Sequence, residues 1–177
     1  MGACCRERRR YIWGESILIF VTIGSQMPFD RLIIAVDEWA KDSGYEVFAQ
    51  VGQTQYIPQH IDWCNNLTPE QFLKKIRDAS AVVSHAGMGT IITALELGKP
   101  IMIMPRRGDL RETRNDHQIA TVKYFTTFDR VEVVMDEKEL VNGFKSLLSS
   151  SSLLKDHTPI GSYANDFLIS TIRNYIN

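Results

Sequence analysis

A histidine, two glycines and a threonine stand close together in the stretch SHAGMGT, residues 84–90. A short apolar run, 79–83, precedes this stretch, and a helix-like run, 91–97, follows it. The first N–H groups of a helix have no partners within the helix, and the helix dipole makes that end positive. Glycines there let a phosphate approach these donors, and the Thr90 hydroxyl adds another. The stretch is either a phosphate-binding loop or a tight turn in which His85 bonds locally.

Several other kinds of site are excluded by the residues around this stretch. The dinucleotide pattern G-x-G-x-x-G fails because Ile92 stands where the third glycine belongs, and the P-loop pattern is absent. No G-x-S-x-G occurs, so Ser84 beside His85 is a poor hydrolase nucleophile. The four histidines are dispersed and lack carboxylates at ligand spacing. We therefore expect no metal site and no cofactor.

Glu96 lies seven residues after Gly89, about 10 Å along the same helix at 1.5 Å per residue. Helical side chains lean back toward the N-terminus. A carboxylate at this position could accept hydrogen bonds from a ribose whose diphosphate contacts the glycines. The alternative is a solvated helix glutamate, although its neighbours are mostly apolar.

Six short apolar runs predict strands. ILIFVTI and IMIM are uninterrupted, as is typical of parallel strands that are buried on both faces. The expected strands cover residues 17–23, 45–51, 61–65, 80–85, 101–104 and 130–135.

Helical periodicity alternates with these strands. Pro28 and Gly44 delimit the first helix, and Thr68 is a typical N-cap for the second. The expected helices cover about residues 28–43, 68–79, 89–98, 115–125, 137–148 and 163–176.

This alternation predicts an α/β fold, a single Rossmann-like domain with a parallel sheet of about six strands flanked by helices. Ligands of such sheets bind beyond the carboxyl ends of the strands. The segments GSQMP, HAGMGT and PRRGDLRETRNDHQ all follow predicted strands there. A ligand site is therefore expected at this edge.

Charged residues are unevenly distributed along the chain of 177 residues. The net charge is −1, but residues 1–10 hold four arginines and one glutamate, so the remainder carries −4. Such a body gives no electrostatic reason to bind nucleic acid. We expect a flexible basic tail over residues 1–16 and one domain over residues 17–177. No apolar run is long enough to span a membrane, and the three cysteines have no CxxC spacing, which fits a reducing cytosol.

Four motifs in order resemble one known family. They are VTIGSQMPFDRL, SHAGMGT with Glu96 and GKP, MPR, and Glu112 with NDHQ. Together they resemble the C-terminal, donor-binding half of GT-B glycosyltransferases of family 28. The likeness is strongest to the small stand-alone subunits of two-component UDP-sugar transferases. These include the catalytic subunit of the dolichol-linked UDP-N-acetylglucosamine transferase and bacterial polysaccharide-biosynthesis subunits.

The resemblance implies a role for each matching position. The diphosphate of the donor and its leaving group would be held by Gly24, Ser25, His85, Gly87, Gly89 and Thr90. Glu96 would bind the ribose, and the uracil would lie near 67–72. The sugar would face Asn115, Asp116, His117 and Gln118, with Asp116 and Gln118 as hydroxyl partners. Arg106 would either join the donor site or pair with Glu112.

The resemblance also implies that half of a GT-B enzyme is missing, because a chain of this length has no room for the second Rossmann-like domain. We expect a membrane-associated partner subunit to supply the general base and the binding site for a lipid-linked acceptor. The pair would act at the cytoplasmic face of a membrane. The helix expected at 163–176 would either dock on the partner or pack on its own sheet, and a homo-oligomer stays open.

Two other functions share this pattern. A nucleotide-sugar 2-epimerase has the same fold but needs both domains in one chain. A non-catalytic module that binds nucleotide-sugar or oligomerises is the other alternative, and Glu96 with the NDHQ segment argues against a purely structural role.

Overall fold

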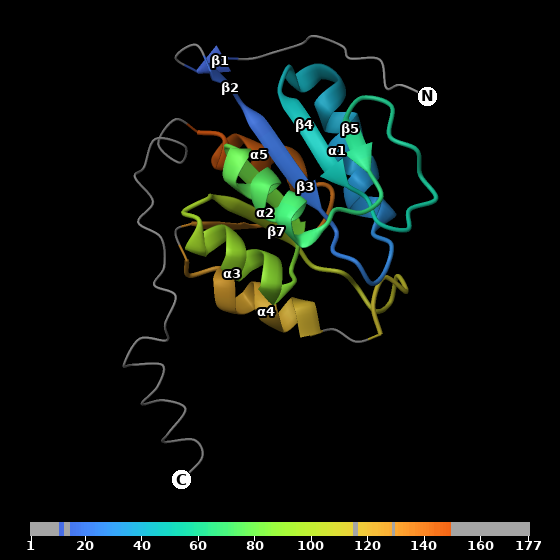
Figure 1. The fold of residues 1–177 in the computed structure, drawn as a ribbon. Coiled ribbons are helices and arrows are strands. Elements are labelled where there is room, and N and C mark those ends of the chain that lie inside the picture. The colour runs from blue at the N-terminus through green and yellow to red at the C-terminus, as the bar shows by residue number, and fades with distance from the viewer. Residues whose placement is uncertain (1–10, 13–14, 115–116, 129, 150–177) are drawn as a thin grey trace.

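The computed structural model describes residues 11–12, 15–114, 117–128 and 130–149, which form a six-stranded parallel sheet between two layers of helices (Figure 1). The sheet order is β5-β4-β3-β6-β7-β8, so the order reverses between β3 and β6. This confirms the predicted single Rossmann-like α/β domain. The strands are β3 (Leu18–Thr22), β4 (Glu46–Gln50), β5 (Asp62–Cys64), β6 (Ala81–His85), β7 (Ile101–Met104) and β8 (Val131–Val133).

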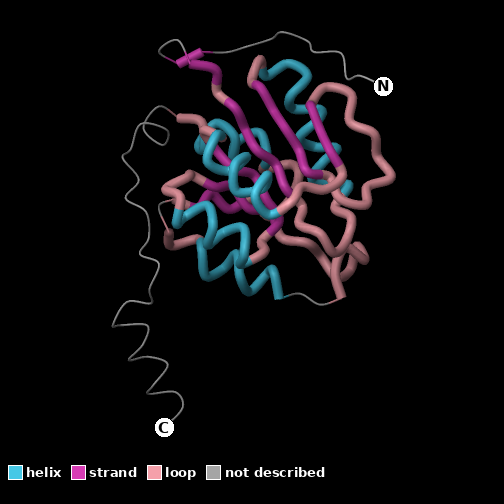
Figure 2. The backbone as a smooth tube through the Cα atoms, in the orientation of Figure 1, coloured by secondary structure: helices cyan, strands magenta, loops and turns pink. Residues whose placement is uncertain are grey.

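Five described helices cover the two faces of the sheet (Figure 2). Buried residues of α1 and α5 share one core cluster, and those of α2, α3 and α4 share the other. The helices are α1 (Asp30–Ser43), α2 (Pro69–Asp78), α3 (Met88–Glu96), α4 (His117–Phe125) and α5 (Leu140–Leu147).

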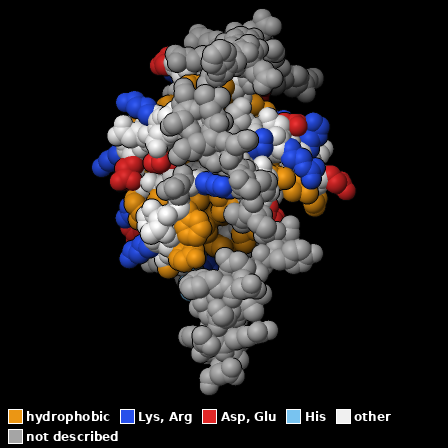
Figure 3. Space-filling model, turned by 90° about the vertical axis from the view of Figure 1, so that its left-hand side faces the viewer, with side chains coloured by type: hydrophobic (Ala, Val, Ile, Leu, Met, Phe, Trp, Pro, Cys, Tyr) orange, Lys and Arg blue, Asp and Glu red, His pale blue; other side chains and the backbone are white. Residues whose placement is uncertain are grey.

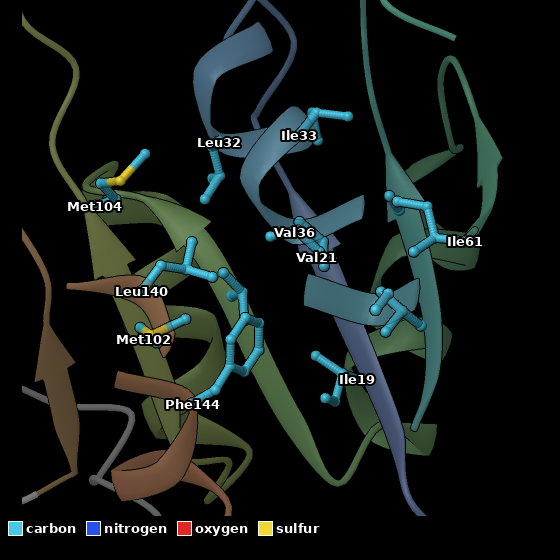
Figure 4. Close-up of a cluster of buried hydrophobic side chains, with 14 of the residues drawn as sticks. Ile19, Val21, Leu32, Ile33, Val36, Ile61, Met102, Met104, Leu140 and Phe144 are labelled. Carbon is cyan, nitrogen blue, oxygen red and sulfur yellow. The ribbon is translucent and has the colours of Figure 1, made fainter. Parts of the chain in front are cut away.

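Alternate residues of the four central strands, β4, β3, β6 and β7, point into opposite clusters. Ile19 and Val21 of β3 face the α1/α5 side, where Leu140 and Phe144 of α5 lie beside Met102 of β7 (Figure 4). The intervening residues of the same strands pack on the α2/α3/α4 side. Burial on both faces explains why these strands read as unbroken apolar runs.

The helix ends follow local chemistry. At the start of α2, Thr68 accepts a hydrogen bond from the N–H of Gln71, whose side chain accepts one from the N–H of Thr68. This capping box stabilises the predicted start. The helix α1 ends at Gly44 with φ 73°, as predicted, but begins two residues later than expected because Phe29 is its N-cap.

Some expected elements differ or lie outside the described residues. Tyr11–Ile12 and Glu15–Ser16 form the antiparallel strands β1 and β2 within the segment expected to be a tail. The helix expected at 163–176 and the start of the one expected at 115 fall outside the described residues. In the described part of the chain, no helix is long and apolar enough to cross a bilayer. The face in Figure 3 carries charged side chains of both signs and a group of hydrophobic ones.

Asp37 of α1 is a fully buried carboxylate on the core side of its helix. It accepts hydrogen bonds from the Tyr56 hydroxyl at 2.7 Å and from the backbone N–H groups of Gln59 and His60 at 2.9 and 2.8 Å. These donors outweigh burial and lower the pKa of Asp37, and the carboxylate raises the pKa of Tyr56 to about 12. Asp37 therefore anchors the later part of the loop between β4 and β5 to α1, while Asp30 of the same helix accepts a hydrogen bond of 2.6 Å from the Thr54 hydroxyl in its earlier part.

We predict that Asp37→Ala lowers the free energy of unfolding by about 3 kcal/mol, because it leaves several buried donors without an acceptor. Urea denaturation at pH 7 measures the change. The matched control is Glu38→Ala, which removes an exposed carboxylate from the next position and should cost less than about 0.5 kcal/mol. Equal effects of the two substitutions would contradict the role of Asp37.

Candidate donor-binding site

A cavity of about 780 Å³ opens at the carboxyl ends of β3, β6 and β7, where the strand order reverses. Open parallel sheets bind ligands at this switch point, and the volume lies in the range of roughly 300–1,000 Å³ found for ligand pockets. The cavity brings together segments that the sequence predicted to meet. Its described lining consists of Ile23, Gly24, Ser25, Gln26, Met27, His85, Gly87, Gly89, Thr90, Arg106, Thr113, Arg114 and Gln118.

The imidazole of His85 packs directly against two glycines. A Cβ atom built on Gly24 would lie 2.8 Å from Cε1 of the ring, and one built on Gly87 would clash with Nε2. Gly24 also has φ 75°, a left-handed backbone conformation that residues with a side chain rarely adopt. Gly24 and Gly87 are therefore needed to make room for the histidine. From the sequence, we had expected the space at Gly87 to hold a diphosphate.

Gly89 differs, because a Cβ built on it would meet no atom within 4 Å. It lies in the first turn of α3, whose N-cap is Gly87 with no side-chain cap. Among the described residues, no hydrogen-bond acceptor is found for the N–H groups of Met88, Gly89 and Thr90. This helix end therefore presents free donors and a positive dipole to the cavity, as an anion site requires.

His85 is neutral at physiological pH. Burial and, to a smaller extent, the nearby Arg106 charge lower its pKa to about 4, although a hydrogen bond to the Thr22 backbone acts in the opposite direction. The Nδ1 atom lies 3.3 Å from the Ser84 hydroxyl. A neutral imidazole can exchange hydrogen bonds with a ligand but is a weak proton acceptor.

Arg106 is a buried cation at the edge of the cavity. Its guanidinium donates to the carbonyls of Ile23, at 2.7 Å, and of Met27. The Nε atom has no hydrogen-bond partner among the described residues, and burial lowers the pKa of the group. Among the described residues no close ion pair joins Arg106 to Glu112, whose carboxylate oxygens both accept hydrogen bonds from Arg31, so Glu112 acts on Arg106 only through its charge.

Gln118 of α4 faces the same cavity, as predicted. Its Oε1 atom accepts a hydrogen bond of 3.0 Å from the backbone N–H of Arg106. This bond fixes the side-chain amide, whose nitrogen remains a donor. His117 is exposed at the start of α4 and does not line the cavity. Asn115 and Asp116 lie outside the described residues.

Two predicted assignments have no support from the described lining. Glu96 is exposed at the last residue of α3 and does not line the cavity, so its ribose role stays a prediction. Leu67 and Phe72 pack against the core cluster under α2, and no residue of 67–72 lines the cavity. The uracil assignment therefore also stays a prediction.

Five lining residues were not singled out from the sequence: Ile23, at the end of the first expected strand, and four others, Gln26, Met27, Thr113 and Arg114. The four others share one property. Each belongs to a polar segment that follows a strand, so the signal was present at the level of segments. Nothing in the spacing indicated which side chains of those segments turn inward.

Comparison with known proteins identifies the family. Residues 18–159 match the glycosyltransferase family 28 C-terminal domain, and the chain belongs to this family. The human UDP-N-acetylglucosamine transferase subunit ALG13 is 30% identical over 119 residues, covering 59% of this chain and 10% of the human protein. The chain thus spans about a tenth of that relative's length.

Solved structures agree on the fold. The glycotransferase of kitacinnamycin superposes with a TM-score of 0.59 at 17% identity, covering 86% of this chain and 40% of that one. The NMR solution structure of ALG13 superposes with a TM-score of 0.55 at 20% identity, covering 90% of this chain and 98% of that one. UDP-GlcNAc 2-epimerase from Neisseria meningitidis superposes with a TM-score of 0.56 at 14% identity, covering 81% of this chain and 40% of that one.

We predict opposite effects for alanine at Gly87, the N-cap of α3, and at Gly89 in its first turn. Gly87→Ala should lower the free energy of unfolding by about 1–3 kcal/mol, because its Cβ enters the space of the His85 ring. Gly89→Ala meets no atom and should leave stability unchanged or raise it by up to about 1 kcal/mol. Thermal and urea denaturation measure both. The packing explanation fails if the two variants are equally stable.

We also predict a pH effect from His85. Its pKa is lower in the folded state than in the unfolded chain, so acidification protonates the unfolded chain first. Stability should fall as pH drops from 6.5 toward 4, by up to about 3 kcal/mol from this group. Denaturation of the wild type and of His85→Asn at pH 7, 5.5 and 4.5 isolates the contribution. A constant difference in stability between the two proteins across these pH values would refute the prediction.

Proposed function

We propose that this chain is the donor-binding subunit of a two-component glycosyltransferase, which moves a sugar from a UDP-sugar to a lipid-linked acceptor. One observation carries the proposal. The cavity at the strand switch point combines the free N–H groups of Gly89 and Thr90 with the buried cation Arg106, and its described lining includes no carboxylate. This is an environment for a dianionic diphosphate.

The chemistry follows from that environment. Breaking the bond between the anomeric carbon and the UDP oxygen leaves negative charge on the β-phosphate. Donors that are already oriented toward this position stabilise the charge without reorganisation, and a helix N-terminus supplies both donors and a dipole. In our proposal Gly89 and Thr90 fill this role, and the Gln118 amide donates to a hydroxyl of the sugar.

A partner subunit would supply the remaining chemistry. Deprotonation of the acceptor hydroxyl needs a base whose pKa lies near the working pH. Among the described lining residues the only imidazole is that of His85, whose pKa of about 4 makes it a poor base. The name of the human relative, a transferase subunit, supports a two-component arrangement. We infer that the partner brings the base, the lipid-linked acceptor and the contact with the cytoplasmic face of a membrane.

Binding experiments test the donor role. Thermal unfolding of the full chain with UDP, UDP-glucose and UDP-N-acetylglucosamine should show stabilisation by at least one of them. Gly89→Ala should weaken that binding by about tenfold in calorimetry, because a methyl group at this cavity-lining position would occupy open space beside the helix donors that the diphosphate needs.

The matched control is Ile92→Ala, which changes an exposed residue of the same helix that does not line the cavity and should leave the affinity unchanged. Absence of stabilisation by all three nucleotides would contradict the donor role. Binding without transfer, with transfer appearing when a membrane-associated partner is added, would support the two-component arrangement.

A further inference from the structure

Arg31 and Glu112 form a forked ion pair between α1 and the segment that follows β7. Nε of Arg31 lies 2.8 Å from Oε1 of Glu112, and a terminal guanidinium nitrogen lies 2.8 Å from Oε2. Both side chains are largely shielded, with 14% and 11% of their surface exposed. Forked pairs of this kind are among the strongest polar contacts in proteins and fix orientation as well as distance.

The carboxylate of Glu112 also closes residues 105–114, here called the clamp loop. Its Oε2 atom accepts a hydrogen bond of 2.9 Å from the backbone N–H of Arg107, and its own N–H donates to the Arg107 carbonyl at 3.2 Å. Arg111, between these points, has φ 57°, a left-handed conformation that a side chain rarely adopts. The closed loop therefore holds a turn that the chain alone would not favour.

Arg31 holds the clamp loop at both of its ends. The terminal nitrogen Nη2, which contacts Oε2 of Glu112, also donates to the carbonyl of Pro105 at 3.1 Å. The other terminal nitrogen, Nη1, donates to the Glu137 carboxylate at 3.1 Å. The loop carries cavity-lining residues at each end, with Arg106 just inside the start and Thr113 and Arg114 after Glu112. A shift of Glu112 would therefore move the wall of the cavity.

We propose that Arg31 and Glu112 are a positioning pair, which sets the clamp loop against the bound donor. Neither residue lines the cavity, so both act through the loop. The ligand in this inference rests on the proposed function. The restraint on the loop rests only on the contacts just described.

Substitution tests the positioning role. Arg31→Met should weaken binding of the stabilising UDP-sugar by about tenfold, because misplaced binding groups lose a large share of their effect even when the fold is kept. Arg31→Lys keeps the charge but cannot form the fork, so it should restore only part of the affinity. Glu112→Gln and the double variant Arg31→Met/Glu112→Gln complete a cycle. If the two residues act through one contact, the double variant binds no worse than the weaker single variant.

Hydrogen exchange gives a readout that needs no ligand. Peptides covering 105–114 should exchange faster in Arg31→Met than in the wild type, while peptides from α2 and β4 stay protected. If the wild type binds no UDP-sugar, the proposed function fails, yet this comparison still tests the restraint. Unchanged exchange in the clamp loop would overturn the restraint itself.

The matched control lies in the same loop. Arg107 and Asp109 form an exposed ion pair of 2.6 Å whose side chains make no contact with α1 among those found. Arg107→Met removes the same charge as Arg31→Met but should change affinity by less than about twofold, as expected for an exposed pair. Equal loss in the two variants would indicate a general effect of charge. Faster exchange in Arg31→Met with unchanged affinity would overturn the link between the clamp loop and the donor.

Discussion

Arg106, just beyond β7, connects three segments that surround the cavity. Its buried guanidinium donates to the backbone after β3 at Ile23 and in the following loop at Met27. Its backbone N–H donates to the side chain of Gln118 in α4. A buried cation with no carboxylate in contact is costly, and carbonyl oxygens offset only part of that cost. The surplus positive potential faces the cavity. In the proposed function, an anion that binds in the cavity would recover part of the free energy that burial of this charge costs.

The central strands were predictable because burial on both faces leaves a short apolar run bounded by turn residues. The segment 101–104 is an example, and its predicted limits match β7. The meeting of the glycine-rich segments was also predictable, because parallel strands end at one edge. The first residue of a helix was harder to predict than the limits of a strand. The helix α1 begins at Asp30 with Phe29 as its N-cap, and not at Pro28.

The details of the site depended on contacts between distant parts of the chain. Gly87 looked like a phosphate contact, but its missing side chain makes room for His85. Arg31 and Glu112 are 81 positions apart, and nothing in either segment marks them as partners, so Arg106 was the nearer candidate for Glu112. Asp37 was invisible for a related reason, since its donors come from a loop with no regular structure.

Asp37 has a consequence for how this protein can vary. Two of its three closest donors are backbone N–H groups, those of Gln59 and His60, which every amino acid except proline provides. The loop's path is thus largely independent of which side chains it displays. Natural or laboratory diversification can change the exposed side chains of the loop while two carboxylates on α1, Asp37 and Asp30, preserve its course. The loop is a suitable place to install new recognition without rebuilding the domain.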